Sequence, residues 1–169
     1  EATPASDTFD LKVCIASEPQ TIDPALNSAV DGAVMTQHMF EGLMKWSNAG
    51  SKSDDKLYAA EVVPGQAASY EKTDNGDGTV TYTFTLRDDI KWSDGQPVTA
   101  QDFVYSWQRL ATPDTAADYC YMIDMVSGYE AVNSGEADPT ALGVSAPDER
   151  TFVVELTYDC PYFLEVCAF

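Results

Sequence analysis

The sequence predicts an α+β fold, in which β-hairpins and helices pack around a common core. Residues 79–86 (TVTYTFTL) alternate apolar residues with threonines, which is typical of a half-buried strand. Residues 99–110 place apolar side chains at helical spacing behind a threonine that suits a helix N-cap. The predicted elements do not follow the regular strand–helix–strand order of a parallel sheet, so we expect mostly antiparallel pairing.

The N-terminal residues predict a linker, a strand and a helix. Residues 1–8 (EATPASDT) are polar and contain proline, which favours a disordered linker. Residues 9–15 alternate apolar side chains and predict a strand. Asp31 is expected to cap a helix that runs to about residue 44. Residues 43–46 are also compatible with the start of a short strand, and the sequence leaves both interpretations open.

A loop and a turn precede the first predicted hairpin. Residues 48–56 are polar and rich in Ser, Asp and Gly, which indicates a loop. Residues 62–65 (VVPG) indicate a turn. Residues 67–72 and 79–86 flank the segment DNGDG, whose glycines can adopt a positive φ. These two segments therefore predict a β-hairpin.

Residues 91–110 (KWSDGQPVTAQDFVYSWQRL) carry the strongest local signals of the chain. Residues 92–95 predict a turn, because Asp bonds its own backbone and Gly adopts the left-handed conformation at little cost. Thr99 and Asp102 have the spacing of a capping box. The apolar face of the predicted helix consists of Phe103, Val104, Trp107 and Leu110. None of these side chains is chemically reactive, so we interpret the stretch as scaffold.

Short elements are expected beyond residue 110. Thr112-Pro113-Asp114 should end the helix. The predicted elements that follow are helices over residues 116–125 and 126–133, a turn over 140–143, a hairpin of 144–146 with 151–156, and a final helix that begins at Cys160-Pro161.

The charge balance excludes two classes of partner. The chain carries 28 acidic and 9 basic residues, and its formal net charge is −19. Binding of nucleic acid requires clustered Lys and Arg, and an anionic membrane surface attracts the same residues. We therefore expect a solvated acidic surface, with no nucleic acid partner. No apolar run approaches the roughly 20 residues that a membrane-spanning helix needs.

The sequence offers little for catalysis or metal binding. His38 is the only histidine, and its apolar surroundings favour a core or boundary position over a catalytic one. An EF-hand alignment on Asp77-Gly78 places Thr73 and Phe84 where carboxylate ligands are needed, so it fails. No phosphate-binding or dinucleotide motif is present. The sequence therefore predicts neither an enzyme nor a cofactor or metal site.

Four cysteines leave the disulfide state open. Cys160 and Cys167 are separated by two helical turns, roughly 10 Å along one face, which is too far for a bridge within a helix. A pairing of Cys14 with Cys167, or of Cys120 with Cys160, is favoured over a local pair in a secreted chain. Buried free thiols remain an equal alternative.

Aromatic side chains are the candidates for a ligand cleft. Tryptophan and tyrosine combine a large apolar surface with a polar group, which suits binding sites. We interpret Trp92 and Trp107 as core residues. Trp46, Tyr119 and Tyr121 remain candidates for a cleft.

Five segments together resemble one protein family. They are residues 17–24 (SEPQTIDP), 39–43 (MFEGL), 84–87 (FTLR), 92–110 (WSDGQPVTAQDFVYSWQRL) and 161–163 (PYF). In this order they are similar to segments of the extracellular solute-binding proteins of the oligopeptide and dipeptide ABC-transporter type, family 5. Members of that family are several times longer, so the resemblance implies that this chain is an N-terminal fragment.

The resemblance implies a domain organisation. The fold would be the N-terminal part of a periplasmic-binding-protein-like II fold, whose lobes close over a ligand. Residues 9–43 would supply the first strand and helix of an incomplete lobe I. Residues 44–160 would form the small extra domain of this family. Residues 161–169 would begin the return into lobe I.

The resemblance also implies a function. The protein would be the substrate-binding component of an ABC importer, capturing peptides outside the membrane and delivering them to the permease. It would lie on the extracellular face of the membrane as a lipid-anchored protein, or in the periplasm. Two alternatives remain: the same family with a nickel complex, a sugar or an opine as ligand, and a self-contained cell-surface interaction module.

Candidate ligand-binding residues follow from the resemblance as well. In peptide-binding relatives the loop after the Asp-Pro pair lies along the peptide backbone like an added strand. Here that loop consists of Asn27, Ser28, Ala29, Val30 and Asp31, and its sequence departs from that of the peptide binders. Tyr119 falls where some relatives place a ligand-contacting tyrosine. The apolar faces of residues 9–15 and 160–169 could also support self-association of the fragment.

Overall fold

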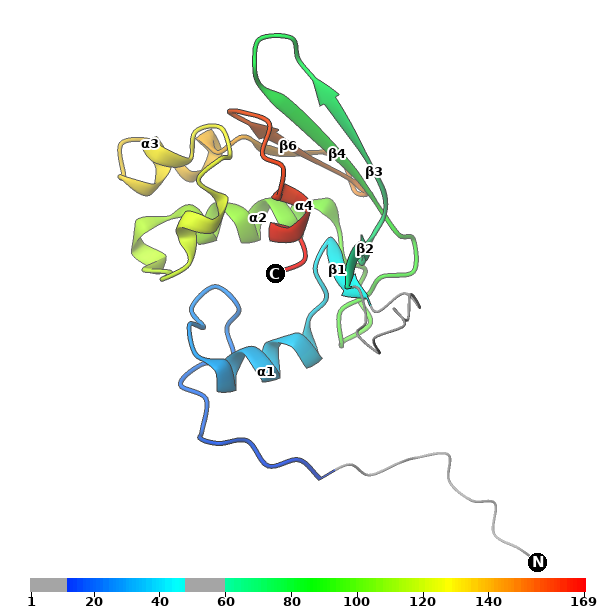
Figure 1. The fold of residues 1–169 in the computed structure, drawn as a ribbon, viewed down its shortest axis with the longest axis vertical. Helices are drawn as coiled ribbons and strands as arrows, with labels where there is room; N and C mark the ends of the chain where they lie inside the picture. Colours follow the sequence, from blue (N-terminus) through cyan, green and yellow to red (C-terminus); the bar gives the residue numbers. More distant parts are fainter. Residues whose placement is uncertain (1–11, 48–59) are drawn as a thin grey trace, which may run out of the picture.

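A computed structural model describes residues 12–47 and 60–169. Within these residues a main sheet contains four antiparallel strands in the order β3-β4-β6-β5, and β1 pairs with β2 in a separate two-stranded sheet (Figure 1). The strands are β1 (Met44–Ser47), β2 (Glu61–Pro64), β3 (Ala67–Asp74), β4 (Val80–Leu86), β5 (Val144–Asp148) and β6 (Thr151–Leu156). The α+β class and both predicted hairpins are confirmed.

The helices in the described residues are α1 (Val30–Met39), α2 (Ala100–Ala111), α3 (Tyr129–Asn133) and α4 (Phe163–Val166), with 3-10 turns at Pro113–Thr115, Cys120–Ile123 and Pro139–Ala141. In Figure 1, α2 and α4 lie on the same side of the sheet, and α1 lies apart at the bottom of the view. No helix in this part of the chain has the length and apolar composition needed to cross a bilayer.

The core is built from alternate residues of the two central strands. Val80, Tyr82, Phe84 and Leu86 of β4 are all buried, as the alternation predicts. Phe163 of α4 is fully buried against this row, with its ring centroid 4.7 Å from that of Tyr82. Aromatic pairs at this separation stabilise beyond the area they bury. The core therefore joins the end of the chain to the middle of the sheet.

The stretch from Lys91 to Leu110 folds as predicted. Gly95 adopts a φ of 88° in the turn, and the Thr99 amide donates to Asp102 Oδ2 at 2.7 Å in a capping box. Trp107 packs on Phe152 with ring centroids 5.5 Å apart, which confirms its core role. Trp92 is 44% exposed, so its interpretation as a core residue is wrong. It precedes the helix in a surface turn and does not share the buried face of α2.

The N-terminal predictions fare less well. Residues 12–15 form no strand, and Val13 is 70% exposed, because no other described strand pairs with them. The described residues do not include residues 9–11, the linker predicted over 1–8 or the loop predicted over 48–56. Of the two interpretations of residues 43–46, the strand is confirmed as β1.

Helix α1 differs from its predicted form at both ends. Ala29 occupies the N-cap, and Asp31 lies in the first turn, where its carboxylate accepts a hydrogen bond from the Ser17 hydroxyl. A carboxylate in this turn still interacts favourably with the helix N-terminus. The helix ends at Met39, because Phe40 is extended. His38 is exposed, with Nδ1 2.6 Å from the carbonyl oxygen of Val34, so a core position is wrong.

Four further elements are displaced from their predicted limits. Residues 61–64 form β2, and the predicted turn follows at Gly65. The two helices predicted over 116–133 shrink to a 3-10 turn and α3, which begins after Gly128 at a φ of 78°. The final helix begins at Phe163 because Tyr162 is not helical, and Pro161 lies in the preceding turn.

The four cysteines are free thiols, so neither favoured pairing forms. Cys14 is exposed, Cys120 is half-buried, and Cys160 and Cys167 are buried. Burial raises the pKa of the Cys167 thiol, with a smaller contribution from Cys160 nearby. The alternative of buried free thiols is therefore confirmed for Cys160 and Cys167, whereas Cys14 and Cys120 are free but not buried.

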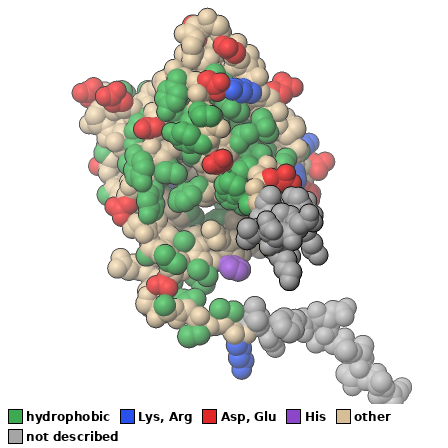
Figure 2. All heavy atoms as spheres, in the orientation of Figure 1, with side chains coloured by type: hydrophobic (Ala, Val, Ile, Leu, Met, Phe, Trp, Pro, Cys, Tyr) green, Lys and Arg blue, Asp and Glu red, His purple; other side chains and the backbone are tan. Residues whose placement is uncertain are grey.

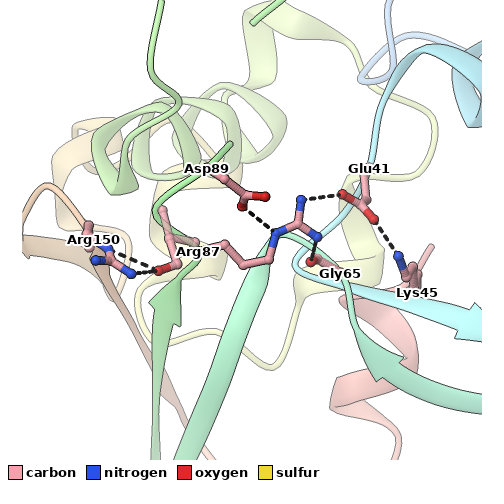
Figure 3. Close-up of polar contacts among 7 residues, drawn as sticks. Glu41, Lys45, Gly65, Arg87, Asp89 and Arg150 are labelled. Carbon is pink, nitrogen blue, oxygen red and sulfur yellow. Dashed lines mark hydrogen bonds and ion pairs between the residues drawn. The ribbon is translucent and has the colours of Figure 1, made fainter. Parts of the chain in front are cut away.

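Arg87 connects the segment after α1 to both sheets (Figure 3). Its Nη1 donates to the carbonyl oxygen of Gly65 at 2.7 Å, and its Nε donates to Asp89 at 3.0 Å. Its Nη2 lies 3.6 Å from Glu41, which also pairs with Lys45 at 2.8 Å. These contacts fix residue 41, just beyond α1, relative to the turn between β2 and β3.

Candidate functional site

Asp23 organises the turn that precedes the predicted ligand loop. Its carbonyl oxygen accepts hydrogen bonds from the amides of Leu26 and Asn27, at 3.1 and 3.0 Å. Its carboxylate accepts a further bond from the amide of Ala25 at 3.0 Å. Such local bonds are how Asp stabilises a turn. The direction in which the chain leaves this turn is therefore set by one residue.

The loop from Asn27 to Asp31 exposes its middle residues. Ser28, Ala29 and Val30 are exposed, and Ala29 is extended with φ −114° and ψ 148°. The backbone amides of Ser28 and Val30 find no acceptor among the described residues. Ala29 is the N-cap of α1 and Val30 is its first residue, so the Val30 amide is one that a helix N-terminus leaves without an intrahelical acceptor. An exposed extended residue flanked by two free amides suits pairing with an added peptide strand.

Asn27 is fixed against the first turn of α1. A Cβ at position 32 would lie 1.9 Å from Asn27 Oδ1 and 2.9 Å from the carbonyl oxygen of Thr21, so only glycine fits there. The same Oδ1 accepts from the Ala29 amide at 3.4 Å. The glycine therefore allows the Asn27 side chain to pack onto the helix, and this contact shapes the loop.

Arg109, near the end of α2, binds Asp23 with both terminal nitrogens. Nη1 donates to Oδ1 at 2.9 Å and Nη2 donates to Oδ2 at 2.5 Å. Hydrogen bonding to this guanidinium is the largest cause that lowers the pKa of Asp23 below 3.8. Arg109 also lines a pocket of about 250 Å³ with Tyr105, Gln108, Thr112, Thr115 and Pro139.

Tyr119 lies in an exposed aromatic group at the start of the 3-10 turn Cys120–Ile123. It is 37% exposed, and its ring meets those of Tyr121 and Phe169 edge-on, at centroid distances of 6.1 and 6.0 Å. A neighbouring pocket of about 240 Å³ is lined by Trp46, Met122, Tyr162, Glu165, Val166 and Phe169. Hydrogen bonds to Tyr158 and Cys160 raise the pKa of Tyr162 to about 12, so its hydroxyl stays neutral.

The face of the molecule in view in Figure 2 is largely apolar. Figure 2 shows hydrophobic side chains gathered over the centre of this face, with acidic side chains mostly toward its margins. Concave apolar surfaces with a few polar groups are typical of ligand sites. No group of His, Cys, Asp or Glu in residues 12–47 and 60–169 is arranged to hold a metal ion.

The two predicted parts of the site are linked only indirectly. No hydrogen bond within the described residues joins the Asn27–Asp31 loop to Tyr119. Arg109 instead bonds a residue four positions before each part: its side chain holds Asp23, and its carbonyl oxygen accepts from Thr115 Oγ1 at 2.6 Å. Sequence reasoning missed Arg109, because an ion pair between distant residues leaves no local pattern.

The comparison with a protein family gives one match that covers most of the chain. Residues 61–169 match the family described as bacterial extracellular solute-binding proteins, family 5 Middle. The match includes the main sheet, α2 and the aromatic group around Tyr119.

Curated relatives match a larger part of the chain. The periplasmic murein peptide-binding protein MppA of Escherichia coli is 37% identical over 156 residues, which is 91% of this chain and 26% of the relative. The oligopeptide-binding protein OppA of Bacillus subtilis is 38% identical over 160 residues, or 94% and 27%. The chain thus spans about a quarter of the length of these relatives.

Solved structures agree with the sequence matches. The unliganded open form of MppA superposes with a TM-score of 0.78 at 37% identity, covering 91% of this chain and 28% of that one. Haemophilus influenzae OppA in complex with the peptide RPPGFSPFR gives a TM-score of 0.78 at 37% identity, covering 90% and 28%. The mixed arrangement of helices and antiparallel strands is therefore the arrangement found in part of these proteins.

Proposed function

The chain belongs to the bacterial extracellular solute-binding proteins of family 5, and on that premise we propose that it is part of a peptide-binding component of an ABC importer. The protein captures peptides outside the membrane and delivers them to the permease. The observation that supports this function best is the exposed segment Ser28–Val30, in which Ala29 is extended and the amides of Ser28 and Val30 find no acceptor among the described residues. Two relatives named for binding oligopeptides are 38% and 40% identical to this chain, over 94% and 89% of its length.

The proposed domain organisation follows the resemblance to the family. Residues 44–160 form the small domain of the family, with the main sheet and α2 at its centre. Residues 9–43 belong to a neighbouring lobe, and residues 161–169 begin the return into that lobe while Phe163 still packs in the core of the small domain. Their exposed apolar side chains, including Val30 and Phe169, suit a surface that packs against further protein.

The proposed ligand contacts are those of the loop and of Tyr119. Asn27, Ser28, Ala29, Val30 and Asp31 present their backbone to an extended peptide, which supplies affinity independent of the peptide sequence. Tyr119 offers an aromatic face and a hydroxyl to a side chain of the ligand. Water in the remaining space lets such a site accept varied side chains.

A second candidate is a non-peptide solute. One relative, a probable deoxycholate-binding periplasmic protein of Escherichia coli, is 37% identical over 154 residues. The aromatic pocket beside Trp46 and Phe169 is consistent with an apolar ligand of that kind. We favour peptides because the exposed backbone of Ser28–Val30 suits a strand-like partner and offers little to a rigid apolar one.

Location and assembly complete the proposal. Two relatives are named as periplasmic proteins. We propose that this protein acts outside the cytoplasmic membrane, either attached to it by a lipid anchor or free in the periplasm.

The isolated chain exposes Phe169 and part of α1, which favours self-association. Light scattering at several concentrations tests this, and a monomer mass throughout would contradict it.

Native mass spectrometry of co-purified material tests the ligand class. A protein of the relatives' length that contains this chain is purified without denaturation, and the released small molecules are identified. The proposal predicts a heterogeneous set of short peptides. A single non-peptide solute would contradict it and would favour the second candidate.

A further inference from the structure

We infer that Arg109 is a positioning residue that fixes both ligand-contacting segments to helix α2, an inference that rests on the proposed peptide site. Its side chain and its backbone act on different parts of the chain. The guanidinium holds Asp23, four residues before Asn27, and the carbonyl oxygen holds Thr115, four residues before Tyr119. One residue thus sets the position of two segments that share no hydrogen bond among the described residues.

The contact with Asp23 controls the start of the loop. Asp23 uses its carboxylate for Arg109 and Ala25, and its carbonyl oxygen for Leu26 and Asn27. A bidentate guanidinium–carboxylate pair fixes orientation as well as distance, because two parallel bonds define a plane. Movement of Asp23 would therefore change the direction in which the chain enters the Asn27–Asp31 loop.

The contact with Thr115 controls the path toward Tyr119. The hydroxyl of Thr115 donates to Arg109 O at 2.6 Å, and the Thr112 hydroxyl donates to Gln108 O at 2.7 Å. Both carbonyl oxygens also accept from the Thr112 amide, at 3.2 and 3.1 Å, so the two hydroxyl groups add a second partner to each at the end of α2. The next residue, Ala116, is left-handed at a φ of 51°, so the chain turns sharply before it reaches Tyr119.

Helix α2 is a suitable reference element because it is itself firmly held. Its N-terminus has the capping box of Thr99 and Asp102, and Val104 and Trp107 pack against the core. A binding site requires supporting residues on rigid elements, since small displacements of contacting groups weaken binding. Through the contacts of Arg109, the exposed segments are held in a fixed position relative to this helix.

Lysine cannot replace arginine in this role. A lysine ammonium is a compact point charge on a flexible stem, whereas guanidinium donors lie in one plane and match a carboxylate. Arg109→Lys should therefore keep the charge and lose the fixed orientation. Arg109→Met removes both, and Asp23→Asn removes the acceptor charge with little change in shape.

Hydrogen exchange of the chain tests the inference without a ligand. In Arg109→Met the amides of Leu26 and Asn27 should exchange at least about tenfold faster, because a charge-assisted bond no longer holds their acceptor residue. Arg109→Lys should give an intermediate increase. In the double variant that carries Asp23→Asn and Arg109→Met, the same two amides should exchange no faster than in the faster of the two single variants, because both substitutions break the same contact. Amides of β4 and β6 should stay unchanged.

Arg87→Met is the matched control, because Arg87 holds a carboxylate elsewhere in the fold. It should leave the amides of Leu26 and Asn27 unchanged. Equal exchange of these amides in Arg109→Met and in the original chain would overturn the inference, whatever the ligand is. So would equal acceleration by Arg87→Met, since the effect would then be a general loss of stability.

Peptide binding separates this inference from the proposed function. In a protein of the relatives' length, Arg109→Met should weaken binding of a mixed tripeptide library about tenfold or more, and Arg109→Lys less. If the original protein binds peptides and Arg109→Met binds them equally well, the inference is overturned and the function stands. If the original protein binds no peptide, the function is overturned, and the exchange result alone decides whether Arg109 positions the segments.

Discussion

Asp23 and Arg109 lie 86 positions apart in the sequence and form two hydrogen bonds, of 2.9 and 2.5 Å. Both side chains are about one-third exposed, so the pair contributes orientation more than stability. It joins the turn before the loop Asn27–Asp31 to the helix that carries the strongest local signals of the chain. The proposed ligand surface therefore depends on a contact that no local pattern reveals.

Titration of Asp23 should reveal this contact. The hydrogen bonds from Arg109 hold the folded-state pKa of Asp23 below its ordinary value of 3.8. A depressed pKa adds stability above the unfolded value, and that stability is lost as the pH falls through the folded value. Arg109→Met should therefore raise the pKa of Asp23 toward 3.8. Carboxyl carbon shifts measured by NMR check this, and equal pKa values in both proteins would contradict the contact.

Removing the Phe163 ring should destabilise the core strongly. Phe163 is fully buried, and its centroid lies 4.7 Å from that of Tyr82. Phe163→Ala should lower the free energy of unfolding by about 3–5 kcal/mol, through lost burial and the cavity left behind. Phe163→Leu is a milder variant that should remain folded. Tyr105→Ala removes an exposed aromatic side chain on α2 and should change the free energy of unfolding by no more than about 0.5 kcal/mol.

Urea unfolding followed by tryptophan fluorescence measures these differences. If Phe163→Ala and Tyr105→Ala had equal effects, α4 would not be part of the core.

The capping box should contribute measurably to α2. Thr99→Ala removes the side chain that caps the first turn, and should cost about 1 kcal/mol of stability. Gln101 is exposed in the same turn, so Gln101→Ala is the matched control. Denaturant midpoints of the two variants check the prediction, and indistinguishable midpoints would show that the cap does not contribute.

The thiols should react in an order set by burial. A chromogenic disulfide reagent at neutral pH should modify exposed Cys14 first and half-buried Cys120 more slowly. Cys160 and Cys167 should react only in denaturant, since burial raises the pKa of Cys167 and excludes the reagent. The expected total without reductant is four thiols. A total of two or none would show that disulfides form.

The middle of the chain could be predicted because its signals are local. The threonine-rich alternation of β4, the glycines of its hairpin and the Thr99 cap each specify a conformation within a few residues. The predictions that failed concern residues whose environment depends on contacts with distant parts of the chain. Val13 lacks a pairing strand among the described residues, and His38 lies on a helix face that nothing in this part of the chain covers.

The candidate site was only half accessible from the sequence. Asn27–Asp31 and Tyr119 were selected by resemblance, and the structure gives the loop an extended, exposed middle. Trp46 was a cleft candidate and does line an aromatic pocket, whereas Trp92 stands in a surface turn. The sequence does not distinguish Arg109 from other charged residues of the chain, because its partner Asp23 lies 86 positions away.

Calorimetric titration with short peptides measures whether the proposed site binds them and whether Tyr119 takes part. The protein is one of the relatives' length that contains this chain, compared with its Tyr119→Ala variant and with Tyr158→Ala as a control at a similarly exposed tyrosine. We expect peptide binding that Tyr119→Ala weakens about tenfold and Tyr158→Ala leaves unchanged. Absence of peptide binding, or equal affinity in all three proteins, would contradict it.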